Sequence, residues 1–156
     1  MQGDPRVVEL LNQHLTLELT AINQYFLNAR MCHNWGYPRL ASRHREISMQ
    51  EMRDTEELID RILYLEGHPN LQRLGTVRIG ESPVEQITLA LALERGAVGD
   101  LNGYIATCAE IGDHGTREFL AAMITEEERH VDYWETQLAT IERIGEANYL
   151  AQQVRE

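Results

Sequence analysis

The chain has 156 residues, of which 43% are apolar and 25% charged, and its formal net charge at pH 7 is −11. We expect one domain over residues 1–156, because a chain of this length can bury most of its surface. All 14 basic residues are arginine, and the acidic balance argues against a nucleic-acid partner, since phosphate binding needs basic patches. No membrane-spanning run or signal peptide is visible, so we expect a cytoplasmic protein with no membrane partner. Cys32 and Cys108 are predicted to be buried free thiols.

The first predicted helix covers residues 5–32, with an aspartate as its cap and a proline in its first turn. Glu18 lies seven residues from both Leu11 and Tyr25, so it belongs to the inward face. Residues 34–38 contain glycine and proline and are predicted to form a turn. An acidic side chain is therefore expected inside this helix's apolar stripe.

The second predicted helix runs from about residue 40 to 66, and Glu51 and Asp54 share its apolar stripe. Residues 67–81 are too irregular for a helix. At up to about 3.3 Å per residue this connection can run the length of a bundle, so the second and third helices are expected to be parallel. A single long crossover of this kind is typical of ferritin-like bundles.

The third predicted helix begins with a capping box at Ser82, and Glu94 lies on its apolar face. Residues 112–116 are predicted to form a turn. The fourth helix then carries Glu127 and His130 one turn apart on its inward face.

A glycine ends the fourth helix, and residues 146–153 are predicted to form a short fifth helix. We expect that helix to find little to pack on in an isolated bundle, which favours a role in oligomer contacts. No strand pattern competes with these helices. The predicted fold is an all-α, ferritin-like four-helix bundle with one long crossover and a short C-terminal helix.

The inward-facing ligand residues follow one spacing twice: a Glu, a second Glu 33 residues later, and a further ligand three residues after that. The two copies are Glu18, Glu51 and Asp54, and Glu94, Glu127 and His130. Burying one unpaired carboxylate costs several kcal/mol, and Arg61 and Arg95 are too few and lie mostly off the inward stripe to neutralise four. A single acid facing solvent remains an alternative, but the doubled pattern favours a metal site. Oxygen-rich ligation with imidazole suits a pair of iron or manganese ions.

The sequence resembles the bacterioferritins along essentially its whole length. The segments that carry the resemblance are Met-Gln-Gly-Asp (1–4), Ala-Ile-Asn-Gln-Tyr-Phe-Leu (21–27), Arg-Ile-Leu-Tyr-Leu-Glu-Gly (61–67), Pro-Asn-Leu-Gln (69–72) and Asn-Tyr-Leu (148–150). The resemblance implies a hollow shell of two dozen subunits that oxidises Fe(II) with O2 or H2O2 and stores a ferric mineral. It also implies haem b at two-fold subunit interfaces, for electron transfer and iron release, and a ferredoxin-like reductant as a further partner.

The family's site residues carry over to matching positions in this chain. The implied ferroxidase ligands of a di-iron centre are Glu18, Glu51, Glu94, Glu127 and His130. Within that set, Glu51 and Glu127 would bridge the two irons. Tyr25 matches a tyrosine that can supply an electron, and Met52 matches the axial ligand of haem. From the sequence alone, a core aromatic and an ordinary packing residue are the alternative readings of these two.

Asp54 departs from the family, which has histidine at this position. Five carboxylates and one imidazole give the site a charge of −5, where four carboxylates and two imidazoles would give −4. Asp also reaches less far than His, so we expect weaker iron binding at Glu18 and Asp54, and an intact site at Glu94 and His130.

His14, one turn before Glu18, offers a replacement imidazole, although a core or interface histidine is the favoured reading. Glu46 and Gln50 occupy positions where the family has a His and an Asp on the cavity wall, which argues against that further iron site. The other histidines are predicted to lie in turns or off the inward stripes; they are His33, His44, His68 and His114.

Three functions remain open from the sequence. The first is an iron-storage protein with ferroxidase activity and haem, assembled from identical or mixed subunits. The second is a haem-binding subunit with an impaired ferroxidase site, which assembles with a catalytically competent subunit type; Asp54 motivates it. The third is a di-metal oxidase of an organic substrate, which would need an apolar channel to the metals.

Overall fold

Five helices and no strand make up the protein in the computed structural model, which describes residues 1–156. The predicted all-helical class is confirmed. Two helices begin at the predicted caps: the side chain of Asp4 accepts a hydrogen bond from the backbone of Arg6, and Ser82 accepts one from Glu85. The helices are α1 (Pro5–Trp35), α2 (Pro38–Tyr64), α3 (Pro83–Ile111), α4 (His114–Ile144) and α5 (Glu146–Gln153).

The turns between neighbouring helices are shorter than predicted. Only Gly36 and Tyr37 separate α1 from α2. Gly36 has a φ of 88°, a left-handed conformation that glycine adopts without a steric penalty, so α1 continues to this residue before the chain reverses. α4 begins inside the predicted turn, because the side chain of Asp113 accepts a hydrogen bond from the amide of Thr116 and caps the helix.

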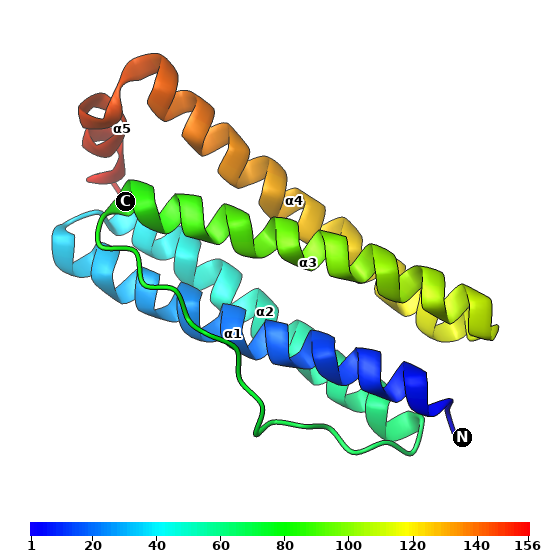
Figure 1. Ribbon diagram of the computed structural model, residues 1–156. Coiled ribbons are helices and arrows are strands. Elements are labelled where there is room, and N and C mark those ends of the chain that lie inside the picture. The colour runs from blue at the N-terminus through cyan, green and yellow to red at the C-terminus, as the bar shows by residue number, and fades with distance from the viewer.

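The first four helices form a bundle of two antiparallel pairs, α1 with α2 and α3 with α4 (Figure 1). Residues 65–82 connect the pairs and run back along α1, so α2 and α3 point in the same direction (Figure 1). The parallel arrangement predicted from the length of the connection is confirmed. No helix has both the length and the apolar content to cross a membrane.

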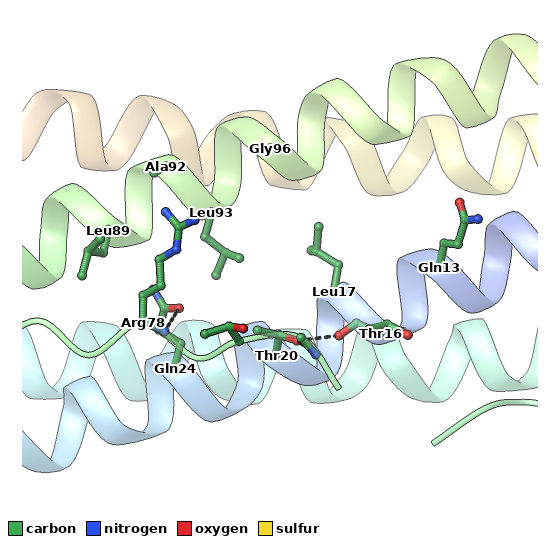
Figure 2. A pocket seen from close by; sticks show the side chains of 12 residues that line it. Gln13, Thr16, Leu17, Thr20, Gln24, Arg78, Leu89, Ala92, Leu93 and Gly96 are labelled. Atoms are coloured by element: carbon green, nitrogen blue, oxygen red, sulfur yellow. Dashed lines mark hydrogen bonds between the residues drawn. The ribbon is translucent and has the colours of Figure 1, made fainter. Parts of the chain in front are cut away.

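Backbone amides of the crossover donate hydrogen bonds to polar side chains of α1. The pairs are Asn70 with Asn12, Gly75 with Thr20, and Arg78 with Gln24. The crossover, α1 and α3 together border a groove in which Thr20, Gln24 and Arg78 lie opposite Leu93 (Figure 2). The path of the crossover is thus fixed by side chains of the helix beneath it.

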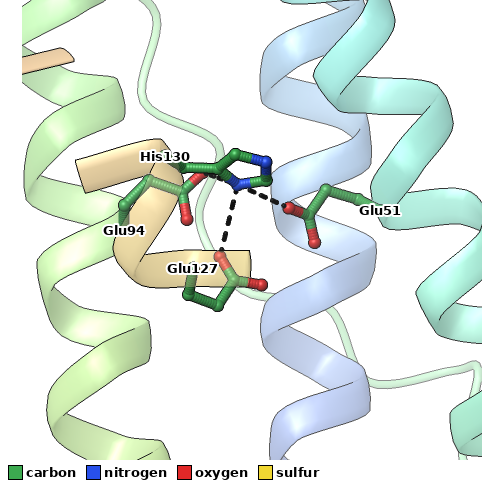
Figure 3. A group of neighbouring side chains, drawn as sticks. All are labelled: Glu51, Glu94, Glu127 and His130. Carbon is green, nitrogen blue, oxygen red and sulfur yellow. Dashed lines mark ion pairs between the residues drawn. The ribbon is translucent and has the colours of Figure 1, made fainter. Parts of the chain in front are cut away.

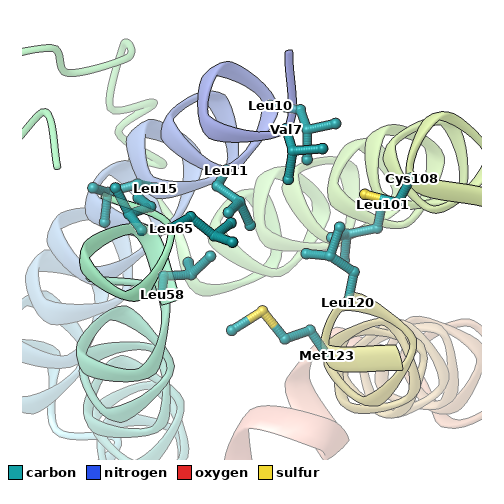
Figure 4. Close-up of a cluster of buried hydrophobic side chains, with 11 residues drawn as sticks. Val7, Leu10, Leu11, Leu15, Leu58, Leu65, Leu101, Cys108, Leu120 and Met123 are labelled. Carbon is teal, nitrogen blue, oxygen red and sulfur yellow. The ribbon is translucent and has the colours of Figure 1, made fainter. Parts of the chain in front are cut away.

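Two clusters of buried apolar side chains fill the bundle, one toward each end. The first contains Leu11, Leu58, Leu101 and Leu120, with one residue from each of the four helices (Figure 4). The second is built from α1 to α4 in the same way and also contains Tyr149 of α5. Both cysteines are buried free thiols, as predicted.

The short helix α5 lies across the end of the bundle and contacts α4 and α2 (Figure 1). Tyr149 is buried in the second apolar cluster, and its hydroxyl donates a hydrogen bond of 2.8 Å to Gln137. The expectation that α5 has little to pack on is therefore wrong, because its tyrosine reaches the core of its own subunit.

Candidate di-metal centre

A band of ionisable residues separates the two apolar clusters. On each bundle helix, these residues lie between the positions that contribute to the first cluster and those that contribute to the second. They are Glu18 from α1, Glu51 and Asp54 from α2, Glu94 from α3, and Glu127 and His130 from α4. All six are buried, as their register predicted, with exposed fractions from 0% for Glu18 to 9% for Asp54.

The imidazole of His130 lies among three carboxylates from three helices (Figure 3). Its Nδ1 is 3.3 Å from Glu51 Oε1, 3.3 Å from Glu94 Oε1 and 3.6 Å from Glu127 Oε2. One ring nitrogen can donate only one hydrogen, so three acid oxygens around it exceed what a neutral imidazole can satisfy. These four residues offer ligand atoms that lie within 4.8 Å of one another.

A second group of possible ligands lies beside the first and shares two of its members. Glu18, Glu51, Asp54 and Glu127 also offer ligand atoms within 4.8 Å of one another. Glu51 and Glu127 thus belong to both groups, which is the arrangement expected of carboxylates that bridge two ions. Asp54 is partly engaged elsewhere, because its Oδ1 accepts a hydrogen bond of 3.1 Å from Gln50.

Several buried ligand atoms in these groups have no hydrogen-bond partner. They include both carboxylate oxygens of Glu18, both of Glu51, and Nδ1 of His130. Nearly all buried polar atoms in proteins are paired, so a set of unpaired ones that converge from several helices indicates a ligand. Carboxylate oxygens with imidazole nitrogen form a donor set that fits iron or manganese.

Burial and mutual interaction shift the pKa values of the cluster. Burial raises the pKa of Glu51 to about 7 and holds that of Glu94 well above its usual range. Burial alone would lower the pKa of His130, but its three carboxylate neighbours favour the charged imidazolium, outweigh burial and raise the pKa to about 12. Without a cation, the cluster therefore limits its negative charge by holding protons, which divalent ions would displace on binding.

Tyr25 is attached to the cluster through Glu94, whereas the sequence placed it beside Glu18. Its hydroxyl donates a hydrogen bond of 2.5 Å to Glu94 Oε1 and accepts one of 2.9 Å from Trp134 Nε1. Burial, with the charge of Glu94, raises the pKa of Tyr25 well above its usual value. Tyr25 therefore links the candidate metal ligands to a buried indole.

His44 was missed by the sequence reasoning, which placed it off the inward stripes. It is fully buried, and its ring stacks on that of Trp134 with 4.8 Å between ring centroids. Burial lowers the pKa of His44 to about 3, so the ring is neutral. Its spacing could have predicted this burial, since His44 lies seven residues, or two helical turns, before Glu51 on the same helix.

Comparison with known proteins agrees with this architecture. The chain matches the family model described as the ferritin-like domain over residues 8–144. It is 48% identical to bacterioferritin BfrA of Mycobacterium tuberculosis, over 97% of this chain and 96% of that protein. The chain belongs to the bacterioferritin family. Bacterioferritins of Rhodobacter capsulatus and Brucella melitensis are 44% and 40% identical to it, over 93% and 96% of this chain and 90% and 92% of theirs.

In this bacterioferritin, Met52 lies outside the buried cluster although it follows Glu51 directly. Its side chain is 43% exposed, and that of Met49 on the same helix is exposed as well. Two successive helical residues point about 100° apart, so Met52 leaves the core where Glu51 enters it. Its thioether is thus accessible from outside the subunit.

Proposed function

We propose that this bacterioferritin takes up Fe(II), oxidises it with O2 or H2O2 at the buried carboxylate cluster, and stores the ferric product in a hollow shell of two dozen subunits. The family supports a role in iron storage. The observation that carries the ferroxidase proposal is the convergence of unpaired acid oxygens and an imidazole between two apolar clusters. A solvated acidic surface would show neither the burial nor the missing partners.

Each residue of the cluster has a role in this proposal. Glu51 and Glu127 would be shared between two iron ions, because each belongs to both ligand groups. The other members divide between the ions: Glu94 and His130 hold one, and Glu18 and Asp54 lie at the other. Iron supplies the change of oxidation state, while the carboxylates neutralise its charge and the apolar clusters on either side limit the access of water.

Tyr25 is proposed to supply one electron to the O2 or H2O2 that is reduced at the cluster. Loss of an electron from a phenol is easiest when its proton has an acceptor, and the hydroxyl already donates to Glu94. The proton would pass to Glu94 Oε1 as the electron leaves, and Trp134 would keep its hydrogen bond to the phenolic oxygen.

Haem b is proposed to bind through Met52. A thioether that is accessible on the outer surface of α2 fits one axial ligand of a haem shared by two subunits, each contributing one methionine. The haem would carry electrons from a ferredoxin-like reductant toward the mineral for iron release. A visible spectrum of the purified protein tests this directly: it should show a bis-methionine haem, and Met52→Leu should abolish the signal.

Stopped-flow measurement of Fe(II) oxidation tests the ferroxidase proposal. Purified protein given two Fe(II) per subunit should show a fast phase, and Glu127→Gln should slow it at least tenfold because a bridging carboxylate is lost. Glu128→Gln is the matched control, since Glu128 neighbours Glu127 in sequence but is exposed. Equal rates in these two variants would contradict the proposal.

The alternative function is a haem-binding subunit with an impaired ferroxidase site, which relies on a competent partner subunit. The observation that favours it is Asp54, whose carboxylate is already bonded to Gln50. In this case wild-type protein would lack the fast phase and Asp54→His would restore it. A fast phase in the wild type rules out this alternative.

A further inference from the structure

His14 of α1 is a fully buried histidine next to the Glu18 end of the cluster. It precedes Glu18 by one helical turn, and its Nε2 lies 2.8 Å from Glu18 Oε1. Despite this approach, neither nitrogen of His14 and neither oxygen of Glu18 makes a hydrogen bond. Apart from the contact of Nε2 with Oε1, these four buried polar atoms have no hydrogen-bond partner, which is unusual for a histidine that only packs in a core.

The separation of the two side chains fits a shared cation. Two ligands at adjacent corners of an octahedron, each about 2.1 Å from the ion, lie about 3 Å apart. His14 Nε2 and Glu18 Oε1 are 2.8 Å apart. His14, Glu18 and Glu127 each offer one ligand atom, and these three atoms lie within 4.8 Å of one another. Side chains from α1 and α4 therefore surround one position at this end of the cluster.

Asp54 belongs to a different group of possible ligands around Glu18, together with Glu51 and Glu127, and it is the poorer ligand. Gln50 holds one of its oxygens in a hydrogen bond, whereas His14 has no competing partner. The other end of the cluster has an imidazole, that of His130, among its carboxylates. With His14 included, each end of the cluster has one imidazole. The ion at Glu18 then no longer depends on Asp54 to complete its set of ligands.

We propose that His14 Nε2 is the imidazole ligand of the metal ion held by Glu18. The nitrogen donor at this end of the centre then comes from α1, one turn from Glu18, and Asp54 contributes a weaker oxygen contact. This inference rests on the two-metal centre proposed above and names the donor set of one of its two sites.

Co(II) titration of the metal-free assembled protein, followed by visible absorption and calorimetry, tests the inference without Fe(II) oxidation. Wild-type protein should bind two Co(II) per subunit. His14→Leu should bind one Co(II) tightly and the second at least tenfold more weakly than the wild type does. Asp54→Ala should lower the affinity for the second ion by less than His14→Leu does. His44→Leu is the control, since it removes a buried histidine that belongs to none of the groups of possible metal ligands; it should keep both sites. Crystals soaked in Co(II) should show an anomalous peak at bonding distance from His14 Nε2.

The outcomes separate the inference from the proposed function. Two tight ions in His14→Leu would overturn the inference and leave the two-metal centre intact. Loss of the second ion in Asp54→Ala but not in His14→Leu would assign the position to Asp54 and equally overturn it. If wild-type protein binds fewer than one Co(II) per subunit, and Glu127→Gln binds the same amount, the metal centre itself is wrong.

Thermal unfolding distinguishes a ligand from a structural histidine. Metal-free His14→Leu should unfold at the same or a higher temperature than the metal-free wild type, because leucine removes two unpaired buried nitrogens. Co(II) should raise its unfolding temperature less than that of the wild type. If leucine prevents folding, His14→Gln replaces it, since the amide can bond Glu18 but is a poor metal ligand, and the same loss of the second ion is expected. Equal Co(II) stabilisation of the variant and the wild type would contradict the ligand role.

Discussion

At the scale of single residues, Glu94 is the acid of the centre that a hydrogen bond joins to the apolar core. Glu94 accepts from Tyr25, and the same hydroxyl accepts from Trp134, so one phenol connects the cluster to the apolar core. Tyr25 and Trp134 are both fully buried, so water cannot take over either bond. The hydroxyl therefore contributes to stability as well as to its proposed electron transfer.

Tyr25→Phe should lower the free energy of unfolding by about 1–3 kcal/mol, because the indole N–H of Trp134 would lose its buried acceptor. Urea unfolding of metal-free protein at a fixed subunit concentration measures this. Tyr104→Phe is the control: Tyr104 is only partly buried and its hydroxyl makes no hydrogen bond within the subunit, so its change should stay within about 0.5 kcal/mol. Similar losses in both variants would contradict the role given to the Tyr25 hydroxyl.

The sequence predicted the buried acids well, because helical register alone decides which side chains of a helix face the core. Glu18 shares a helix face with Leu11 and Tyr25, and both of these are fully buried. The same rule applies to His44, which lies seven residues before Glu51, yet that residue was predicted to lie off the inward stripes. The missing partners of His14 could not be predicted, since they depend on how the side chains of α1 and α4 meet in space.

At the scale of elements, the crossover depends on the polar face of α1. Asn12 makes two hydrogen bonds with the start of the crossover. Its Nδ2 donates one of 3.0 Å to the backbone carbonyl of His68, and its Oδ1 accepts one of 2.8 Å from the backbone amide of Asn70. The sequence predicted the length of this connection and the parallel helices that follow from it. It did not predict the path, because asparagine and threonine on an outer helix face look like ordinary solvated residues.

Asn12→Ala should loosen the first part of the crossover while the bundle stays folded. The variant removes both bonds at once, so the amide of Asn70 should exchange with solvent at least tenfold faster, because a net loss of about 1.4 kcal/mol or more corresponds to that factor. Hydrogen exchange followed by mass spectrometry measures it. Asn23→Ala is the control on the same helix, where the exposed side chain bonds only to its own backbone at Leu19, and it should leave the Asn70 amide protected. Unchanged exchange in Asn12→Ala would show that other contacts hold the crossover.

At the scale of the whole molecule, the isolated subunit exposes several large apolar side chains on the crossover. Leu71 and Leu74 of the crossover are 53% and 59% exposed, and Ile79 further along is also exposed. Large exposed apolar side chains gathered on one segment indicate a surface that another protein covers. We therefore predict that neighbouring subunits cover this segment in the proposed shell.

The double variant Leu71→Glu/Leu74→Glu should therefore fail to assemble while its helices remain intact, because burying two added carboxylates against a neighbour costs several kcal/mol. Sedimentation velocity should show dissociated subunits of 17.9 kDa or small oligomers, with an unchanged far-ultraviolet circular dichroism spectrum.

Gln72→Glu/Thr76→Glu is the matched control, since it adds the same two charges to exposed polar positions of the same segment. Each subunit already has a net charge of −11, so both doubles increase the general repulsion between subunits equally. Only the burial of the two leucine positions differs between them. Equal loss of assembly in both would therefore point to charge repulsion, and full assembly of both would place the crossover outside the contacts between subunits.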